Sequence, residues 1–443
     1  MPISPARSTA FDILLRVDQQ DAFASELLHA TAYQKLSTTD HRLMTDLVMG
    51  VLRWQSRLDE EIGHNSSLKI SKIDPEVLTA LRLATYQLIF LDRIPPRAAI
   101  HESVELVKRA RKRSAGPFAN AVLRKMAGSG AEPLKVEACL TARDLGRVFA
   151  HPLWLVERWV GEFGFATTRK ICTYDQRIPN TTIAIRDDAI ISELELHGIK
   201  LAPGHFLTSA YRLIAGDPQV IPAELRDRIA IQDEGSQLVA HLLGRGARIL
   251  DCCAAPGGKT RILAEGNPAG LVVATELHTH RARLMRTLIT GSNVRIIAAD
   301  AQKLPFATSF DATLVDVPCS GTGTLARNPE IKWRLKPEDI SDLQSRQTAI
   351  LRGTMPHLTP GGRLVYSTCS LEQAENEDVI DKVLAADNSF RLIDCQDRLQ
   401  QLRSEGELVC KDLDSLTSGP YLRTIPGVHP CDGFFAAILE KIQ

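Results

Sequence analysis

The sequence predicts an α/β domain built on a mostly parallel sheet, preceded by an all-helical domain and a small α+β segment. Three patterns lead to this fold class: helical spacing near the N-terminus, a mixed pattern after about 150, and strands alternating with helix-length segments after about 230. At 443 residues the chain exceeds one ordinary domain. We expect a helical domain over 1–130, an α+β segment over 145–228 and the α/β domain over 229–443.

Residues 1 to about 126 have the spacing of amphipathic helices. The clearest helix is expected from Asp74, which can cap it, with Pro75 in the first turn. Its apolar residues recur at helical intervals: Val77, Leu78, Leu81, Ala84, Leu88 and Leu91. A second helix is expected from about Ala98 into a basic stretch. The composition of 127–133 (AGSGAEP) is typical of a linker.

The segment from about 150 to 228 has a mixed pattern. Residues 151–164 (HPLWLVERWVGEFG) predict a helix. Two short runs, 181–186 (TTIAIR) and 211–215 (YRLIA), predict strands. A small α+β segment is the expected outcome.

After about 230, five short runs rich in Val, Ile and Leu predict strands. These runs are 248–253 (RILDCC), 271–276 (LVVATE), 294–300 (VRIIAAD), 312–317 (ATLVDV) and 363–368 (RLVYST). The segments between them are long enough for crossover helices, which indicates a parallel sheet with helices on both faces. Ligands of such sheets bind beyond the carboxyl ends of the strands.

The ends of the first four predicted strands carry the features of a cofactor site. In 251–260 (DCCAAPGGKT), small residues and two glycines let the backbone approach a ligand, although a plain tight turn has the same composition. The following strands end at Glu276, Asp300 and Asp316. Each acid alone is more often a solvated loop residue, but an acid after the second strand suits ribose hydroxyls. Together the features indicate a nucleoside-containing cofactor.

Two cysteines, Cys319 and Cys369, follow the fourth and fifth strands. Either one alone could be a small buried residue. A pair beside a cofactor suits methylation at carbon 5 of cytosine, because a thiolate that adds to carbon 6 activates carbon 5. Asp316 is positioned to hold or protonate N3 of the ring, and the second cysteine to assist release.

The motifs of the C-terminal part resemble the 5-methylcytosine RNA methyltransferases. The matching stretches are DCCAAPGGKT (251–260), DVPCSGTG (316–323), RNPEIKW (327–333), YSTCS (366–370), AENE (374–377) and DGFFAA (432–437). The resemblance implies a Rossmann-like fold that uses S-adenosylmethionine. DNA cytosine-5 methyltransferases carry a PCQ motif and amino-group methyltransferases an (N/D)PPY motif, and this chain has neither.

The resemblance also implies roles for individual residues. Cys369 corresponds to the nucleophile, Cys319 to the cysteine that assists release, and Lys259 is a candidate to reach the target base. The implied cofactor contacts are Cys253, Ala254, Ala255, Pro256, Gly257, Gly258, Lys259, Glu276, Asp300 and Asp316. Glu276 stands where many relatives have aspartate, a change that keeps the acceptor pair.

The N-terminal part resembles the NusB-like RNA-binding domain through 40–59 (DHRLMTDLVMGVLRWQSRLD), 81–110 and 118–125 (FANAVLRK). This fusion is similar to the bacterial 16S ribosomal RNA methyltransferases, which implies small-subunit ribosomal RNA as the partner. In the middle segment, 184–188 (AIRDD) departs from the family motif LRVN, so no RNA contact is carried over there.

A basic stretch, 106–125, is the candidate RNA-binding surface, with seven Lys or Arg and no acid. The residues expected to contact RNA are Lys108, Arg109, Arg111, Lys112, Arg113 and, in a later loop, Lys332. A solvated helix end would have the same composition. Trp333 could stack on RNA or pack in the core.

Composition and charge limit the classes of protein to which this chain can belong. The formal net charge is +0, and the chain shows neither a secretory signal nor a run of about 18 apolar residues. We expect a cytoplasmic monomer with nine free thiols, no metal, no membrane contact and no DNA partner. Two other functions stay open: the same chemistry on transfer RNA or large-subunit RNA, and a non-catalytic RNA-binding assembly or antitermination factor.

Overall fold

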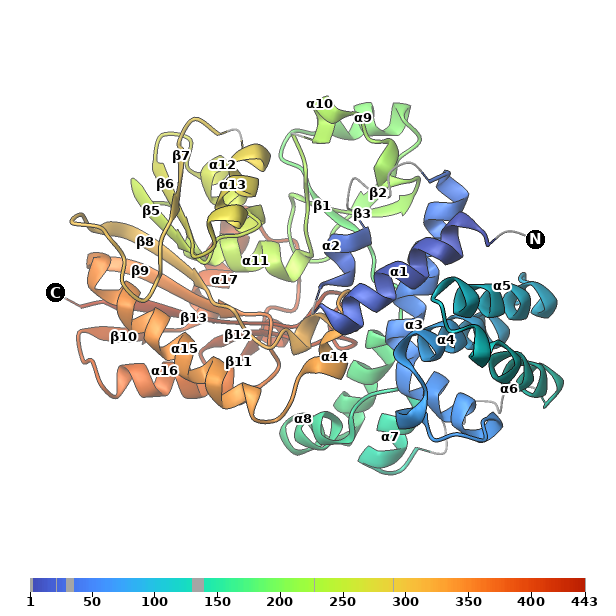
Figure 1. Ribbon diagram of the computed structural model, residues 1–443. Coiled ribbons are helices and arrows are strands. Elements are labelled where there is room, and N and C mark those ends of the chain that lie inside the picture. The colour runs from blue at the N-terminus through green and yellow to red at the C-terminus, as the bar shows by residue number, and fades with distance from the viewer. Residues whose placement is uncertain are drawn as a thin grey trace. The chain divides into compact units, whose positions relative to one another are not determined.

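The computed structural model describes residues 3–20, 22–28, 36–129, 139–226, 228–289 and 291–442 (Figure 1). Its contacts divide the chain into two units. The first comprises Met1–Ile178 and Leu325–Arg334, and the second comprises Pro179–Thr324 and Leu335–Gln443. Each unit has its own buried core, so each is described separately.

The first unit is helical throughout its described residues, as the sequence predicts. Its helices are α1 (Pro5–Gln19), α2 (Ala24–Leu28), α3 (Thr38–Asn65), α4 (Pro75–Phe90), α5 (Pro96–Arg109), α6 (Gly116–Ser129), α7 (Ala142–Val148), α8 (Leu153–Asp175) and α14 (Ile331–Arg334). One apolar core joins α1, α3, α4 and α6 through side chains such as Phe11, Leu47, Leu81 and Leu123. The predicted helix after Asp74 is α4.

Two local expectations for this unit, the cap at Asp74 and the linker at 127–133, were wrong. Asp74 makes no side-chain cap; its carboxylate instead pairs with Lys112 Nζ at 3.0 Å. The second helix, by contrast, runs from Pro96 into the basic stretch as predicted; it ends at Arg109, shortly before Arg111, which adopts a left-handed backbone with φ of 62°. The expected linker 127–133 begins inside α6, which continues to Ser129, and its remainder lies outside the described residues.

The predicted helix over 151–164 forms the first half of α8, and contacts group everything up to Ile178 with the first unit. Trp159 is fully buried there, and His151 Nε2 lies 3.1 Å from Asp175 Oδ2. The sequence instead placed residues from 145 onward with the α+β segment. The domain boundaries that we expect at 130, 145 and 228 concern segments that fold independently, and they stay a prediction.

The second unit begins with the small α+β segment that the sequence predicts. Its antiparallel sheet has the order β2-β3-β1-β4, formed by β1 (Thr182–Ala184), β2 (Lys200–Pro203), β3 (Ala210–Ala215) and β4 (Ala230–Ile231). Helices α9 (Ala189–Leu196) and α10 (Ala223–Arg226) accompany it. The carboxylate of Glu234, on the next helix, accepts the backbone N–H groups of His205, Phe206 and Leu207 and so fixes this segment within the unit.

A nine-stranded sheet forms the centre of the second unit, in the order β11-β12-β13-β9-β8-β5-β6-β7, with β10 beside β13. The strands are β5 (Arg248–Cys252), β6 (Leu271–Glu276), β7 (Val294–Ala298), β8 (Phe310–Asp316), β9 (Leu358–Thr368), β10 (Phe390–Ile393), β11 (Thr417–Ser418), β12 (Tyr421–Thr424) and β13 (Phe434–Lys441). All five predicted strands, β5 to β9, pair in parallel. The strands after β9 pair antiparallel, with β13 against β9.

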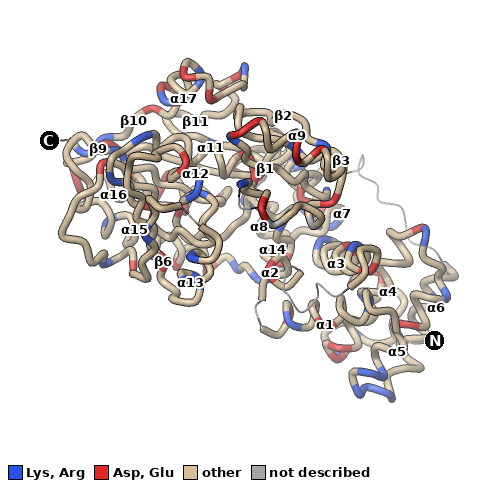
Figure 2. The backbone as a smooth tube through the Cα atoms, turned by 90° about the horizontal axis from the view of Figure 1, so that it is seen from above, with Lys and Arg blue, Asp and Glu red and all other residues tan. Residues whose placement is uncertain are grey.

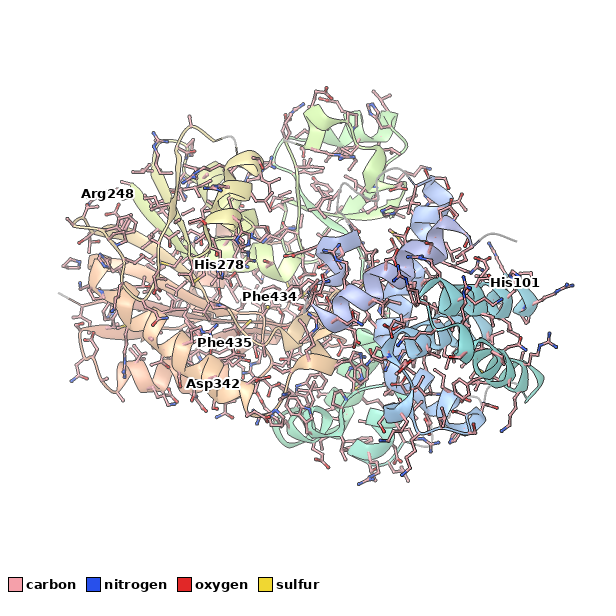
Figure 3. All side chains as sticks on the ribbon, in the orientation of Figure 1. His101, Arg248, His278, Asp342, Phe434 and Phe435 are labelled. Atoms are coloured by element: carbon pink, nitrogen blue, oxygen red, sulfur yellow. The ribbon has the colours of Figure 1, made fainter. Side chains whose placement is uncertain are left out.

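Helices cover both faces of this sheet. They are α11 (Glu234–Leu243), α12 (Gly258–Gly266), α13 (Thr279–Leu288), α15 (Asp339–Thr354), α16 (Glu377–Leu384) and α17 (Cys395–Ser404). Because neighbouring strand residues point to opposite faces, Ile249 packs in the core with α11, α12 and α17, whereas Leu250 packs in the core with α15 and α16. Phe434 and Phe435 on β13 are divided in the same way (Figure 3).

Membrane-spanning helices and metal-binding clusters are both absent from the described residues. None of the helices there combines the length and apolar character needed to cross a membrane. The same part of the chain holds no cluster of three or more His, Cys, Asp or Glu side chains suited to a metal ion.

The close approach of α3 and α4 supplies a stability test. A Cβ on Gly50 would lie 2.0 Å from the ring of Tyr86, whose hydroxyl donates to Asp46. Gly50→Ala is therefore expected to lower the free energy of unfolding by about 1–3 kcal/mol, as overpacking does. Chemical denaturation monitored by circular dichroism measures this change.

Gly63→Ala is the matched control, because it lies on the same helix and its Cβ would make only an ordinary contact at 3.9 Å. This control should keep or raise stability through helix propensity. Equal stability of the two variants would contradict the packing of α3 against α4.

Candidate active site

Two cysteines meet at the carboxyl edge of the parallel sheet. Cys319 follows β8 and Cys369 follows β9, and these strands are paired so that Asp316 lies opposite Ser367. The two Sγ atoms are 3.3 Å apart, and both cysteines are free and half-buried. Both cysteines therefore lie at the edge of the sheet where the sequence predicts them.

Cys319 holds its proton more tightly than an ordinary cysteine. The hydrogen bond with Cys369, followed by burial, raises the pKa of Cys319 well above its ordinary value. Cys319 therefore keeps its proton at neutral pH, and a hydrogen bond links its Sγ to the Sγ of Cys369.

A buried carboxylate, Glu375, joins the loops that carry the two cysteines. Its Oε1 accepts the backbone N–H of Ser320 at 2.8 Å and the amide of Gln347 at 2.8 Å. Its Oε2 accepts the hydroxyls of Ser320 and Ser370. Since Ser320 adjoins Cys319 and Ser370 adjoins Cys369, one side chain fixes both loops.

Backbone contacts reinforce this connection. Gly323 N–H donates to the carbonyl of Cys369 at 2.9 Å, and Gly433 N–H donates to the carbonyl of Gly323 at 2.7 Å. A Cβ on Gly323 would lie only 2.2 Å from that neighbouring backbone, so this approach requires glycine. Asn376 Nδ2 also donates to the carbonyl of Ser370.

An ion pair stands beside the sulfurs. Lys259 Nζ donates to Asp316 Oδ2 at 2.8 Å, and Ser367 Oγ donates to Asp316 Oδ1 at 2.7 Å. Burial on its own would lower the pKa of Lys259, but the charge of Asp316 and the hydrogen bond to it outweigh burial and raise that pKa. Lys259 is accordingly a cation at neutral pH.

The predicted glycine-rich connection lies between β5 and α12. It contains Cys253, Ala254, Ala255, Pro256, Gly257, Gly258 and Lys259, and Gly257 has a φ of 110°. A Cβ on Gly257 would also lie 2.6 Å from Ile289 Cδ1. Both the backbone conformation and the lack of space therefore require glycine here. The turn leads into the first N–H groups of α12, which have no acceptor within the helix.

The three predicted acids differ in exposure. Glu276 is buried at the end of β6, where its Oε1 accepts the N–H of His278. Asp300 is exposed beyond β7, and Asp316 ends β8. A further acid, Asp251, is buried on β5; burial raises its pKa to about 7, and its Oδ1 has no hydrogen-bond partner among the described residues.

The predicted RNA-contact residues of the basic stretch gather at the end of α5 and beyond it (Figure 2). Three of them face acids that lie outside the stretch: Lys108 pairs with Glu105, Arg109 with Asp12 and Lys112 with Asp74. Arg111 and Arg113 are exposed and make no ion pair with the described residues. The surface is therefore less positive than the sequence count of cations suggests.

Lys332 is a correction to the expected RNA contacts. It is only 1% exposed, within the first unit, and its Nζ donates to the carbonyl of Arg53 at 2.9 Å. Burial lowers its pKa to about 7. Trp333 donates from Nε1 to the carbonyl of Leu52. Both side chains hold the segment 325–334 in the helical unit, so we do not propose them as RNA contacts.

Two features were missed by the sequence reasoning. Glu375 lies inside the quoted AENE motif but received no role, and only its burial against both loops reveals one. Helix α13 carries Arg281, Arg283 and Arg286, all exposed, and it follows directly after Glu276. The absence of acids from 277 to 299 was the available signal for that basic helix.

Family models match two parts of the chain. A model described as "16S rRNA methyltransferase RsmB/F" matches residues 242–440, and a model of the NusB family matches residues 4–128. The two matches fall on the mixed sheet with its cysteines and on the N-terminal helices, respectively.

Proteins of known name match nearly the whole chain. The "Probable ribosomal RNA small subunit methyltransferase B" of Bacillus subtilis is 32% identical over 456 residues, covering 100% of both chains. The Synechocystis protein of the same name is also 32% identical, covering 98% of this chain and 99% of its own. Among solved structures, "Crystal Structure of PH0851" shares the fold, with a TM-score of 0.81, 23% identity and 100% coverage of both chains.

Proposed function

We propose that this chain, which belongs to the 16S rRNA methyltransferase RsmB/F family, methylates carbon 5 of a cytosine in small-subunit (16S) ribosomal RNA. The family establishes a methyltransferase that uses S-adenosylmethionine and acts on RNA. The observation that carries the finer proposal is the pair of sulfurs 3.3 Å apart at the carboxyl edge of the sheet. Methylation of an amino or hydroxyl group requires no such pair.

The residues at the carboxyl edge fit S-adenosylmethionine, which supplies an electrophilic methyl group. Glu276 offers a buried carboxylate for the ribose hydroxyls, as acids after the second strand do in nucleoside-binding sheets. The turn at Gly257 leaves no room for a side chain and leads to the free N–H groups of α12, which suit a carboxylate. We assign the cofactor to the loop 253–259 with Glu276, Asp300 and Asp316.

The chemistry begins with a bond from Cys369 Sγ to carbon 6 of the cytosine. The electrons of the 5,6 double bond move toward carbon 5, which becomes nucleophilic, while N3 takes up a proton from solvent and returns it after carbon 5 has been methylated. Asp316 holds the ring at N3, and the Lys259 cation next to it offsets the negative charge that the sulfur brings. Carbon 5 then takes the methyl group.

Cys319 completes the reaction as the base that accepts the carbon 5 proton. The electron pair of that C–H bond restores the 5,6 double bond and expels Cys369 as a thiolate. The pKa of Cys319 is raised first of all by its hydrogen bond with Cys369. Once Cys369 is bound to carbon, that cause disappears, so Cys319 loses its proton more easily when the reaction needs a base.

RNA contacts are proposed for the basic stretch. Lys108, Arg109, Arg111, Lys112 and Arg113 are all at least partly exposed, and phosphates attract such a surface in a salt-dependent way. We propose that Arg111 and Arg113 contribute most, because no acid among the described residues pairs with them. The basic helix α13 extends the set of candidates.

The function is tested by methylation of ribosomal RNA from cells that lack the gene for this protein. Purified protein and S-adenosylmethionine should introduce 5-methylcytosine at one position of small-subunit RNA, detected by mass spectrometry of nuclease fragments. Cys369→Ala should abolish the product. Product on transfer RNA or large-subunit RNA alone would redirect the substrate, and RNA binding without any product would favour a non-catalytic factor.

Glu375→Gln tests the connection between the cysteine loops. The amide loses acceptor capacity toward Ser320 and Ser370, so we expect the rate of methylation to fall by about 10- to 100-fold, as small misplacements of reacting groups do. Binding of S-adenosylmethionine, measured by calorimetry, should change little.

Glu377→Gln is the matched control, since Glu377 is a nearby, partly buried carboxylate that pairs with Arg423 instead of either cysteine loop. Its methylation rate should stay near that of the wild type. A wild-type rate of methylation by Glu375→Gln would show that Glu375 does not position the cysteine loops.

A further inference from the structure

A cavity of about 540 Å³ lies at the edge of the second unit opposite to the cysteines. Arg245 precedes β5 and Arg363 lies in the first half of β9, whereas Cys369 follows the last residue of β9. Because β5 and β9 run in the same direction through the sheet, their amino ends share the edge away from the active site. The cavity is thus separate from the site already described.

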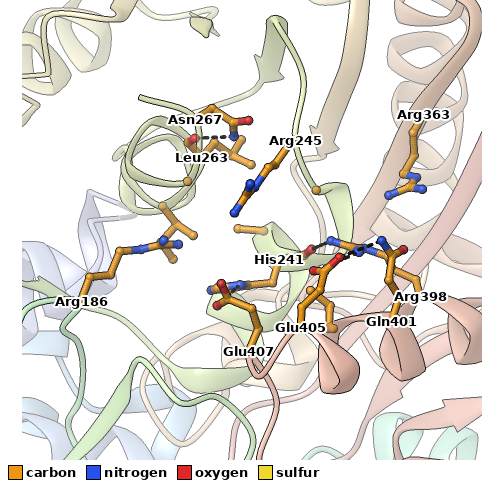
Figure 4. Close-up of a pocket in the computed structure, with 15 residues that line it drawn as sticks. Arg186, His241, Arg245, Leu263, Asn267, Arg363, Arg398, Gln401, Glu405 and Glu407 are labelled. Carbon is orange, nitrogen blue, oxygen red and sulfur yellow. Dashed lines mark hydrogen bonds and ion pairs between the residues drawn. The ribbon is translucent and has the colours of Figure 1, made fainter. Parts of the chain in front are cut away.

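Arginines from four different elements line this cavity. Arg186 follows β1, Arg245 precedes β5, Arg363 lies on β9 and Arg398 lies on α17. Arg186, Arg245 and Arg398 point toward the hollow from different sides (Figure 4). Segments far apart in the sequence therefore bring guanidinium groups to one place.

Two of these guanidinium groups lie close to each other. A Cβ on Gly244, whose φ is 82°, would lie 3.1 Å from Arg363 NH1 and 3.2 Å from Arg398 NH2. Arg398 is 6% exposed and is held by the carbonyls of Leu242 and His241, so it cannot move away. Like charges held together in a partly buried place favour a bound anion.

The acids of the cavity do not balance this charge. Glu405 lies 3.7 Å from Arg398 NH1, and Glu407 lies 3.6 Å from His241 Nδ1. Burial, Arg186 and Arg398 lower the pKa of His241 to about 4, so at neutral pH this histidine adds no positive charge for Glu407. Outside the cavity, Glu265 approaches Arg186 at 3.6 Å.

Arg245 is the cation that remains available to a ligand. It is exposed, and among the described residues it makes no ion pair or side-chain hydrogen bond. Arginine binds phosphate through paired N–H groups in a plane, and several guanidinium groups in one place suit the higher negative charge of a phosphate better than a single carboxylate. Ile262, Leu263 and Leu402 add an apolar wall that suits the organic part of a phosphate ester.

We propose that this cavity binds a phosphate group, with Arg245, Arg363 and Arg398 as its main contacts. The phosphate can come from the backbone of the RNA substrate or from a free phosphate ester. The RNA source rests on the proposed function, whereas phosphate binding itself does not. In the RNA case, the cavity anchors a strand at a distance from the reacting cytosine.

The test uses the full-length protein and inorganic phosphate at low ionic strength, with affinity measured by ³¹P nuclear magnetic resonance titration. Arg245→Gln combined with Arg363→Gln should weaken phosphate binding by about tenfold or more, as loss of charge-assisted hydrogen bonds does. Arg248→Gln is the control. Arg248 is an exposed arginine at the amino end of β5 that bonds Thr308 outside the cavity (Figure 3).

A second titration with a fragment of small-subunit RNA separates the two sources. If RNA supplies the phosphate, the double variant binds RNA more weakly and with a shallower salt dependence, while the control does not. If only inorganic phosphate binding weakens, the source is a free phosphate ester. Undetectable phosphate binding by the wild type, or equal binding by the double variant, would overturn the proposal. Methylation by the wild type reports on the proposed function independently.

Discussion

The parallel pairing of β8 with β9 is the constraint on which the proposed chemistry depends. It brings two cysteines that are fifty positions apart in the sequence to a separation of 3.3 Å. A parallel pair requires a long crossover, and here α15 lies in that crossover and packs on one face of the sheet. The position of the sulfurs therefore depends on the core beneath them as well as on their own loops.

Buried polar groups then convert this proximity into a defined arrangement. Glu375 is fully buried, and burial raises its pKa, yet both of its oxygens accept hydrogen bonds from the cysteine loops. A carboxylate in such a place is costly unless it is fully satisfied. We infer that this cost is retained because the network holds Cys319 beside Cys369.

Much of this site could be predicted from local sequence patterns. Runs of Val, Ile and Leu identify the five parallel strands, and the residues directly after them identify Cys319, Cys369 and Glu276 because strand ends of a parallel sheet share an edge. What could not be predicted depends on contacts between distant residues. Lys332 is buried because its segment packs with the helical unit, and Asp12 and Asp74 neutralise cations that look unpaired in the sequence.

The arginine-lined cavity illustrates the same limit more strongly. Its cations come from positions 186, 245, 363 and 398, and none of them belongs to a local motif. Only the glycine at 244, with its positive φ, marks the place where two guanidinium groups approach the backbone. Pattern reading finds groups that are close in sequence or share strand ends, whereas sites assembled from loops and opposite strand ends require the folded structure.

The central claim is that Cys369 attacks the base and Cys319 releases it. The most direct measurement is to express Cys319→Ser in cells and to look for a protein–RNA adduct that survives denaturation, with sequencing of the attached RNA. The account predicts that the adduct accumulates in Cys319→Ser and disappears when Cys369→Ser is added. Accumulation in Cys369→Ser alone would reverse the two roles, and failure of every variant to trap RNA would contradict the covalent mechanism.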